Sequence, residues 1–224
     1  MSPPVPQLTP FWWWMARALF DPMSRLFRLS VAGKEHLQVD GGVLIVVNHV
    51  SQKDPPFVGV AAMPRYVYYM AKEELFRIPL VGRFIFKAGA FPVRRGGADR
   101  DAIRIAREIL GRGDALVMFP EGTRSKDGRL RRPWPGAGAL ALEPGVTTVP
   151  AAVWGTQRRL GPTRVVFGPP VDLSDLTEGP RSKRAQVAAD RVMAAIAALI
   201  PAAGGPADAA PAPAEQAPER PPVG

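Results

Sequence analysis

This 224-residue chain is predicted to form an α/β fold, in which helices flank a mostly parallel central sheet. Short apolar runs alternate with helical patterns along the chain, which is typical of that fold class. The run at residues 43–47 is apolar throughout, and an uninterrupted apolar strand is typical of a sheet that is buried on both faces. At this length the chain can form one domain with a full hydrophobic core, flanked by terminal segments outside that core.

The individual elements follow from apolar runs and from spacing. Strands are expected at residues 43–47, 66–70, 90–93, 115–119, 149–154 and 164–167. Helices are expected at residues 102–110, 137–143 and 187–199, where apolar side chains recur at helical spacing. Asp99 is the expected N-cap of the first of these helices, and Pro201 is expected to close the last. No internal repeat is visible.

Both ends of the chain differ from its centre. Residues 1–30 are expected to form a membrane-surface segment with an interfacial amphipathic helix, because residues 12–14 are all tryptophan and arginines follow them. The alternative is a first helix docked on the domain's own core, although one helix face cannot bury three consecutive side chains. Residues 201–224 are rich in Pro, Ala and Gly and are expected to be a disordered tail.

Composition excludes some chemistry and favours certain partners. The chain contains no cysteine, which excludes disulfides, thiol nucleophiles and thiolate metal sites. Its net charge of +9 favours anionic surfaces such as a bilayer leaflet, while a compositional bias explains the same charge equally well. Nucleic acid is not an expected partner, because aromatic residues are not interleaved with the basic ones. No stretch reaches the length that a membrane-spanning helix requires.

A histidine and an aspartate follow the first predicted strand. His49 and Asp54 are five positions apart, and the chain has only two histidines. Neutral imidazole titrates near physiological pH, and a carboxylate can hold its second ring N–H and stabilise the imidazolium. The pair therefore predicts a general base with its orienting partner at the carboxyl end of a strand, where ligands sit in such sheets.

Such a base can activate an enzyme serine, a water or a substrate alcohol. Ser51 lies between the two residues, but it lacks the flanking glycines of a nucleophile elbow. Ser51 is better interpreted as a turn or cap residue before a helix that Asp54 and Pro55 open. We therefore expect His49 to act directly on a substrate hydroxyl.

A second polar cluster follows the predicted strand at residues 115–119. Gly122 permits close approach of the backbone, while Thr123 and Arg124 offer hydroxyl, N–H and guanidinium donors suited to phosphate. Glu121 cannot bind phosphate while it is ionised, so it is expected to pair with an arginine or to accept a substrate hydroxyl. Because both clusters begin where a strand ends, they are expected to share one crevice.

Three further cations are candidates. Arg94 and Arg95 form a basic pair at the end of the predicted strand at residues 90–93. Lys72 can aim a cation at a developing oxyanion, and the alternative for this lysine is an exposed position at the start of a helix. Each of these residues singly could be no more than a surface charge.

Taken together, these runs resemble the glycerophospholipid acyltransferases, specifically the 1-acyl-glycerol-3-phosphate acyltransferases. Four blocks are similar to the family's and occur in the same order, at residues 48–54, 82–95, 119–125 and 149–155. The block Phe119-Pro120-Glu121-Gly122-Thr123-Arg124-Ser125 is the most specific of them. The sequence departs from the family's pattern after this block, where Trp134-Pro135-Gly136 stands in place of the usual Lys-Gly pair.

The resemblance implies an acyltransferase domain at residues 31–200 and a specific reaction. His49, oriented by Asp54, would deprotonate the sn-2 hydroxyl of lysophosphatidate, which attacks the thioester of acyl-CoA or acyl carrier protein. The resemblance also implies that Arg94, Glu121 and Arg124, with Gly122 and Thr123, shape the phosphate site. No metal or prosthetic group is implied, because the thioester is a co-substrate. Many members of that family carry longer N-terminal hydrophobic segments than this chain, so the tryptophans and arginines of residues 1–30 predict peripheral attachment to the cytoplasmic face of the cell membrane.

Other functions remain open on the sequence alone. The acceptor could be another lysophospholipid or a glycolipid alcohol, and a hydrolase could use the same pair of residues on water. A non-catalytic basic module that binds lipid is a further alternative, although simple binding does not require a base.

Overall fold

The chain folds around one seven-stranded sheet, which the computed structural model describes together with its helices for residues 4–7, 9–94, 99–125 and 127–209. The strand order is β1-β7-β6-β2-β5-β3-β4, and neighbouring strands are parallel except for the antiparallel pair β6–β7. The strands are β1 (Ser30–Ala32), β2 (Gly42–Val47), β3 (Val67–Lys72), β4 (Ala90–Val93), β5 (Ala115–Met118), β6 (Val146–Trp154) and β7 (Arg164–Phe167). The predicted fold class is confirmed.

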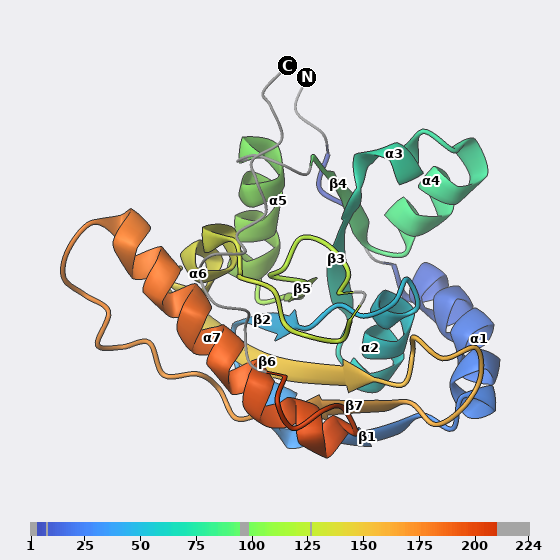
Figure 1. The fold of residues 1–224 in the computed structure, drawn as a ribbon. Helices are drawn as coiled ribbons and strands as arrows, with labels where there is room; N and C mark the ends of the chain where they lie inside the picture. Colours follow the sequence, from blue (N-terminus) through green and yellow to red (C-terminus); the bar gives the residue numbers. More distant parts are fainter. Residues whose placement is uncertain (1–3, 8, 95–98, 126, 210–224) are drawn as a thin grey trace.

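Helices cover both faces of the sheet (Figure 1). They are α1 (Pro10–Leu26), α2 (Asp54–Ala62), α3 (Glu73–Phe76), α4 (Pro79–Lys87), α5 (Arg100–Gly111), α6 (Pro135–Ala141) and α7 (Arg181–Ala203), with a 3-10 turn at Lys34–Leu37. Helices α5, α6 and α7 pack on Leu44 and Val46 of β2, whereas α2 packs on Val43, Ile45 and Val47. All six residues of β2 are buried, as the uninterrupted apolar run predicted.

The helix boundaries confirm one capping prediction and correct another. Asp99 Oδ1 accepts hydrogen bonds from the backbone N–H groups of Asp101 and Ala102, so Asp99 is the N-cap of α5 as predicted. The prediction that Pro201 closes the last helix is wrong, because α7 continues to Ala203 and ends at Gly204 in the left-handed conformation. Ile200 and Ala203 are both buried, and their packing outweighs the one backbone hydrogen bond that proline removes.

Helix α7 is long and apolar enough to cross a membrane by length and composition alone. It packs against α6 and β6, however, and contributes Val192, Met193 and Ile196 to the core. These contacts are those of a core helix. The predicted tail lies outside the described residues from position 210 onward.

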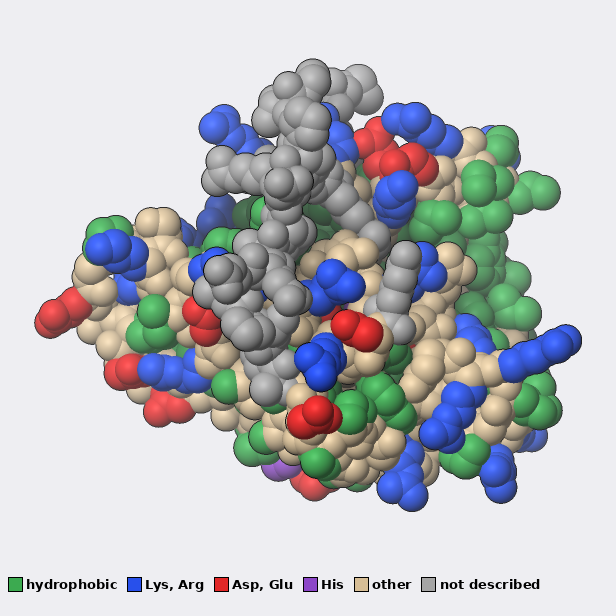
Figure 2. All heavy atoms as spheres, viewed as in Figure 1, with side chains coloured by type: hydrophobic (Ala, Val, Ile, Leu, Met, Phe, Trp, Pro, Cys, Tyr) green, Lys and Arg blue, Asp and Glu red, His purple; other side chains and the backbone are tan. Residues whose placement is uncertain are grey.

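The N-terminal segment forms helix α1, which contacts α2. Phe27 follows the helix and packs edge-to-face on Phe57 of α2. Phe11, Trp14 and Leu19 are exposed, and Figure 2 shows hydrophobic side chains gathered at the flank of the molecule where α1, α3 and α4 lie. The helix therefore docks on the domain and still leaves apolar side chains in solvent. Its contact with a membrane stays a prediction.

Candidate active site

The two polar clusters meet at the carboxyl edge of the sheet. Strands β2 and β5 are parallel neighbours, so the segments that follow Val47 and Met118 leave the sheet on the same side. The amide of Asn48 continues the ladder beyond β2, because its Nδ2 donates to the Val153 carbonyl and its Oδ1 accepts the Val153 N–H. This pair of hydrogen bonds fixes the backbone immediately before His49.

The His49–Asp54 pair is formed and buried. His49 Nδ1 lies 2.7 Å from Asp54 Oδ2, and the Asp54 side chain is fully buried. The same oxygen accepts the backbone N–H groups of Val50 at 2.7 Å and Ser51 at 2.8 Å, and Oδ1 accepts the hydroxyl of Thr156. When Nδ1–H donates to the carboxylate, the lone pair of Nε2 is available as a base.

Ser51 has the local role that the sequence predicted. Its backbone N–H donates to Asp54, and its Oγ accepts the backbone N–H of Lys53 at 3.2 Å, just before α2 begins. These are the bonds of a turn residue. The imidazole of His49 is held from another side, because it stacks on the ring of Phe119 with centroids 4.2 Å apart.

The buried side chain of Glu121 connects its own cluster to the His49 cluster. One carboxylate oxygen accepts the backbone N–H of His49 at 2.9 Å, and the other accepts the backbone N–H of Arg131 at 3.0 Å. Burial raises the pKa of Glu121 to about 7, against the lowering effect of these two N–H donors. The sequence predicted an arginine side chain or a substrate hydroxyl as the partner of this carboxylate. Its partners in the structure are backbone groups, and its predicted part in a phosphate site stays untested.

Gly122 forms a tight turn in the loop that follows β5. Its φ is +65°, and a Cβ at this position would lie 2.8 Å from Nε1 of Trp134. The backbone N–H of Trp134 in turn donates to the Pro120 carbonyl at 2.9 Å. A residue with a side chain would therefore strain the backbone and displace the indole.

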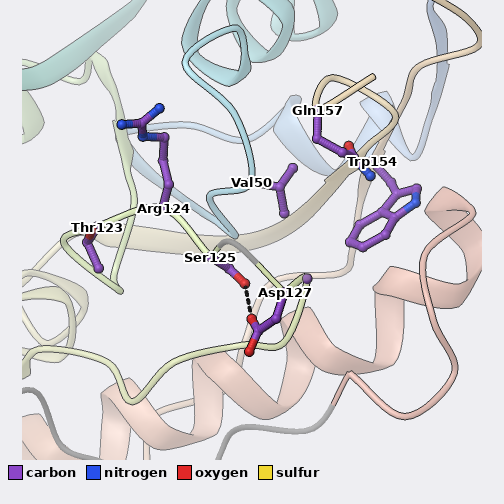
Figure 3. A pocket seen from close by; sticks show the side chains of 8 residues that line it. Val50, Thr123, Arg124, Ser125, Asp127, Trp154 and Gln157 are labelled. Carbon is purple, nitrogen blue, oxygen red and sulfur yellow. Dashed lines mark hydrogen bonds between the residues drawn. The ribbon is translucent and has the colours of Figure 1, made fainter. Parts of the chain in front are cut away.

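A cavity of about 450 Å³ opens at Val50, the residue that follows His49 (Figure 3). The backbone N–H of Ser125 donates to the His49 carbonyl at 2.7 Å, so one wall of the cavity is tied to the backbone of His49. Its lining residues are Val50, Thr123, Arg124, Ser125, Asp127, Gly128, Trp154 and Gln157. Arg124 supplies the one cationic side chain among these lining residues.

Two of the lining residues, Ser125 and Asp127, are joined by a hydrogen bond. Ser125 Oγ donates to Asp127 Oδ1 at 2.8 Å, which Figure 3 draws as a dashed line. This hydrogen bond lowers the pKa of Asp127, so the carboxylate is an anion at neutral pH. Trp154 and Gln157 lie across the cavity from Arg124 in the same view.

The remaining predicted residues lie further along the sheet edge. Lys72 ends β3, where its Nζ pairs with Glu74 Oε1 at 2.8 Å and about half of the side chain is exposed. Arg94 follows the edge strand β4, and its Nε lies 3.6 Å from Asp99 Oδ2 with 70% of the side chain exposed. Arg95 lies outside the described residues. For Lys72 this placement favours the surface alternative. The predicted oxyanion role of Lys72 and the predicted phosphate role of Arg94 stay untested.

Several contributors to the site were not singled out from the sequence, among them Asp127 and Gly128 of the cavity lining and three residues near the end of β6. Thr156, Trp154 and Gln157 come from the end of β6 and the loop after it. The available signal was the fourth block of the resemblance at residues 149–155, which marks a strand end at the same edge of the sheet. Among the described residues, no group of three or more His, Asp or Glu is arranged to hold a metal ion.

Known proteins match both the sequence and the fold. The family model described as Acyltransferase matches residues 28–154, more than half of the chain. The chain belongs to the acyltransferase family. The family predicted from the four blocks is therefore confirmed.

Individual relatives carry more specific names. The 1-acyl-sn-glycerol-3-phosphate acyltransferase of Bacillus subtilis is 33% identical over 175 residues, which are 75% of this chain and 86% of that protein. The lyso-ornithine lipid O-acyltransferase of Pseudomonas aeruginosa is 37% identical over 63% of this chain, which spans about half (52%) of that protein. The crystal structure of the 1-acyl-sn-glycerophosphate acyltransferase PlsC of Thermotoga maritima matches with a TM-score of 0.61 and 25% identity, over 82% of this chain and 80% of that one.

Proposed function

We propose that this acyltransferase moves a fatty acyl group from a thioester to the sn-2 hydroxyl of 1-acyl-glycerol-3-phosphate. His49 Nε2 takes the hydroxyl proton while the alkoxide oxygen attacks the thioester carbonyl. The C–S bond then breaks, and the thiolate leaves with the proton that the imidazolium returns. The products are phosphatidic acid and the free thiol of coenzyme A or of acyl carrier protein.

The observation that carries this proposal is the buried His49–Asp54 pair. The Asp54 carboxylate receives two backbone N–H groups and one hydroxyl besides the imidazole, so it has no freedom to swing away from His49. A base held in this way is needed for proton transfer and is not needed for passive lipid binding. The family match supports the same choice over a non-catalytic module.

The phosphate-bearing acceptor is supported by the cavity and by the relatives' names. Arg124 can donate a pair of N–H groups to a phosphate, and Thr123 adds a hydroxyl at the cavity wall. The Bacillus subtilis relative and the Thermotoga maritima structure are both named for such an acceptor. We propose acyl-CoA or acyl carrier protein as the donor, and the cytoplasmic face of the cell membrane as the place of action.

A second acceptor class has one observation in its favour. The Pseudomonas aeruginosa relative, at 37% identity, is named for a lyso-ornithine lipid. The same base would then act on a hydroxyl of a lipid without phosphate. An acceptor of this kind has no use for the guanidinium of Arg124 as a phosphate ligand.

The test compares His49→Ala with His36→Ala, which makes the same change at the chain's second histidine. His36 lies in the 3-10 turn Lys34–Leu37 away from the dyad, so its variant controls for expression and handling. Labelled acyl-CoA is offered with lysophosphatidate, lysophosphatidylcholine and lyso-ornithine lipid, and each product is identified. We expect His49→Ala to lose at least about a thousandfold in kcat with the preferred acceptor. Transfer retained in folded His49→Ala would contradict the mechanism, and a preference for lyso-ornithine lipid would favour the second acceptor class.

A further inference from the structure

Helices α3 and α4 present an apolar tip to solvent. Four large apolar side chains within seven residues are exposed, and their exposed fractions are Leu75 42%, Ile78 50%, Leu80 82% and Val81 41%. Helix α4 packs closely on α3 at Gly82, its one buried residue, because a Cβ there would lie 2.5 Å from the carbonyl oxygen of Phe76. The two helices thus pack closely on each other, and their exposed apolar side chains remain in solvent without packing in the core.

The charges around this tip are mostly basic. Arg83 and Lys87 are exposed on α4, and Arg77 lies between the two helices. The two acidic residues of α3 are each paired with a cation, since Glu73 contacts Arg77 and Glu74 contacts Lys72. The net charge of residues 72–87 is therefore positive, with an apolar surface at its centre.

The tip lies at the same flank of the molecule as helix α1. Figure 1 places α3, α4 and α1 on one side of the sheet's end, and Figure 2 shows hydrophobic side chains along that flank with Lys and Arg at its border. Helix α1 adds exposed Phe11, Trp14 and Leu26 to this flank, and Arg25 is exposed next to Leu26. Apolar side chains bordered by cations match the headgroup and acyl boundary of an anionic leaflet.

We propose that helices α3 and α4 are a membrane-docking element, whose Leu80 and Val81 enter the interface of an anionic bilayer. This surface is separate from the predicted contact of α1, because it belongs to the connection between β3 and β4. The choice of a bilayer as occupant rests on the proposed function, since an acylated acceptor with one chain is delivered from a membrane surface. Docking through the domain would hold the sheet edge with His49 at a fixed orientation to the lipid.

The experiment measures flotation of the full chain with vesicles of phosphatidylcholine that contain phosphatidylglycerol, without any acyl donor. Val81→Asp is compared with Val187→Asp, because these valines have similar exposed fractions of 41% and 45% and Val187 lies on α7 at a different part of the molecule. We expect Val81→Asp to weaken vesicle binding about tenfold or more, and Val187→Asp to leave it within twofold. Added salt is expected to weaken binding by the wild type.

Equal vesicle binding by the two variants would overturn the proposal. If Val81→Asp instead converts a dimer to a monomer in size-exclusion chromatography without changing vesicle binding, the surface joins two copies of the chain and the proposal is also overturned. Should Val81→Asp fail to fold, Leu80→Ser at the most exposed position replaces it in the same comparison. Acyl transfer to lysophosphatidate in detergent micelles is measured in parallel. Its absence from all forms would contradict the proposed function and leave the flotation result intact.

Discussion

The centre and the outer part of the sheet's carboxyl edge hold their polar residues in opposite ways. Near β2 and β5, the side chains of His49, Asp54 and Glu121 are buried. Both carboxylates accept backbone N–H groups, and the His49 ring is bonded to Asp54. Near β3 and β4, Lys72 and Arg94 are exposed and form ion pairs with acidic neighbours close in sequence. At the centre of this edge, the positions of the polar side chains are therefore fixed by the fold. In the outer part, the exposed side chains can exchange their ion-pair partner for water.

Backbone donors account for this difference. A backbone N–H cannot rotate away as a lysine or arginine side chain can, so a carboxylate that receives two of them has a fixed position. Exposed ion pairs contribute about 0–1 kcal/mol and are screened by salt. We therefore expect substitutions at the centre to lower kcat strongly, and substitutions in the outer region to have small effects.

The largest effect is expected for Asp54→Asn. The carboxylate accepts from His49, Val50, Ser51 and Thr156, and an amide cannot accept at both of its ends. The imidazole then loses its tautomer and orientation, and kcat is expected to fall by roughly 10³–10⁴-fold. Steady-state kinetics with saturating lysophosphatidate measures the loss.

Thr156→Val is the control for Asp54→Asn. It removes the hydroxyl donor on Oδ1 and leaves the bond between His49 and Oδ2 in place. We expect it to cost about 1–3 kcal/mol in the free energy of unfolding and to lower kcat much less. A folded Asp54→Asn variant with near-normal kcat would show that Asp54 only closes the turn through Val50 and Ser51.

A smaller effect, up to about a hundredfold in kcat, is expected for Glu121→Gln. Glutamine can accept only one of these two N–H groups and turns its NH₂ group toward the other, so the link between the backbones of His49 and Arg131 is broken. If Glu121 acts only through this backbone, kcat falls and KM for the acceptor stays constant. If it contacts the acceptor, as the sequence predicted, KM rises instead.

The raised pKa of Glu121 also predicts how the stability of Glu121→Gln relative to wild type depends on pH. Burial raises this pKa from an ordinary value of 4.5 to about 7, so between these pH values the folded protein holds a proton that the unfolded chain has released. The stability contributed by this group therefore falls as pH rises from 4.5 to 7. Denaturant titrations should show Glu121→Gln gaining about 3 kcal/mol relative to wild type across that interval. A pH-independent difference would place the carboxyl pKa near its ordinary value.

The contrast between the two regions also explains how far the sequence could predict the site. The apolar runs located β2 and β5 and hence the meeting of His49 with Glu121, because residues that end neighbouring parallel strands share an edge. That rule gives the edge but not the order of strands along it. Lys72 and Arg94 also end strands, yet β3 and β4 lie beyond β5.

Tertiary contacts account for the rest. Thr156 reaches Asp54 across 102 positions of sequence, and no local pattern marks that hydroxyl as a partner of the dyad. Glu121 carries a recognisable signal, but the backbone groups that it binds leave no signal in residue types. The end of α7 was missed because burial of Ile200 and Ala203 overrides the local effect of Pro201.

The smallest expected effects separate two arginines that the sequence placed in one phosphate site. Arg124 lines the cavity beside His49, whereas Arg94 lies three strands from β2 along the sheet and is held near Asp99. We expect Arg124→Ala to raise KM for lysophosphatidate about tenfold, from loss of a charge-assisted hydrogen bond, and to leave lyso-ornithine lipid transfer nearly unchanged. Arg94→Ala should change neither KM by more than about twofold, because its ion pair is exposed. Equal effects of the two changes on KM for lysophosphatidate would mean that the acceptor phosphate reaches β4, and that the outer region takes part in binding after all.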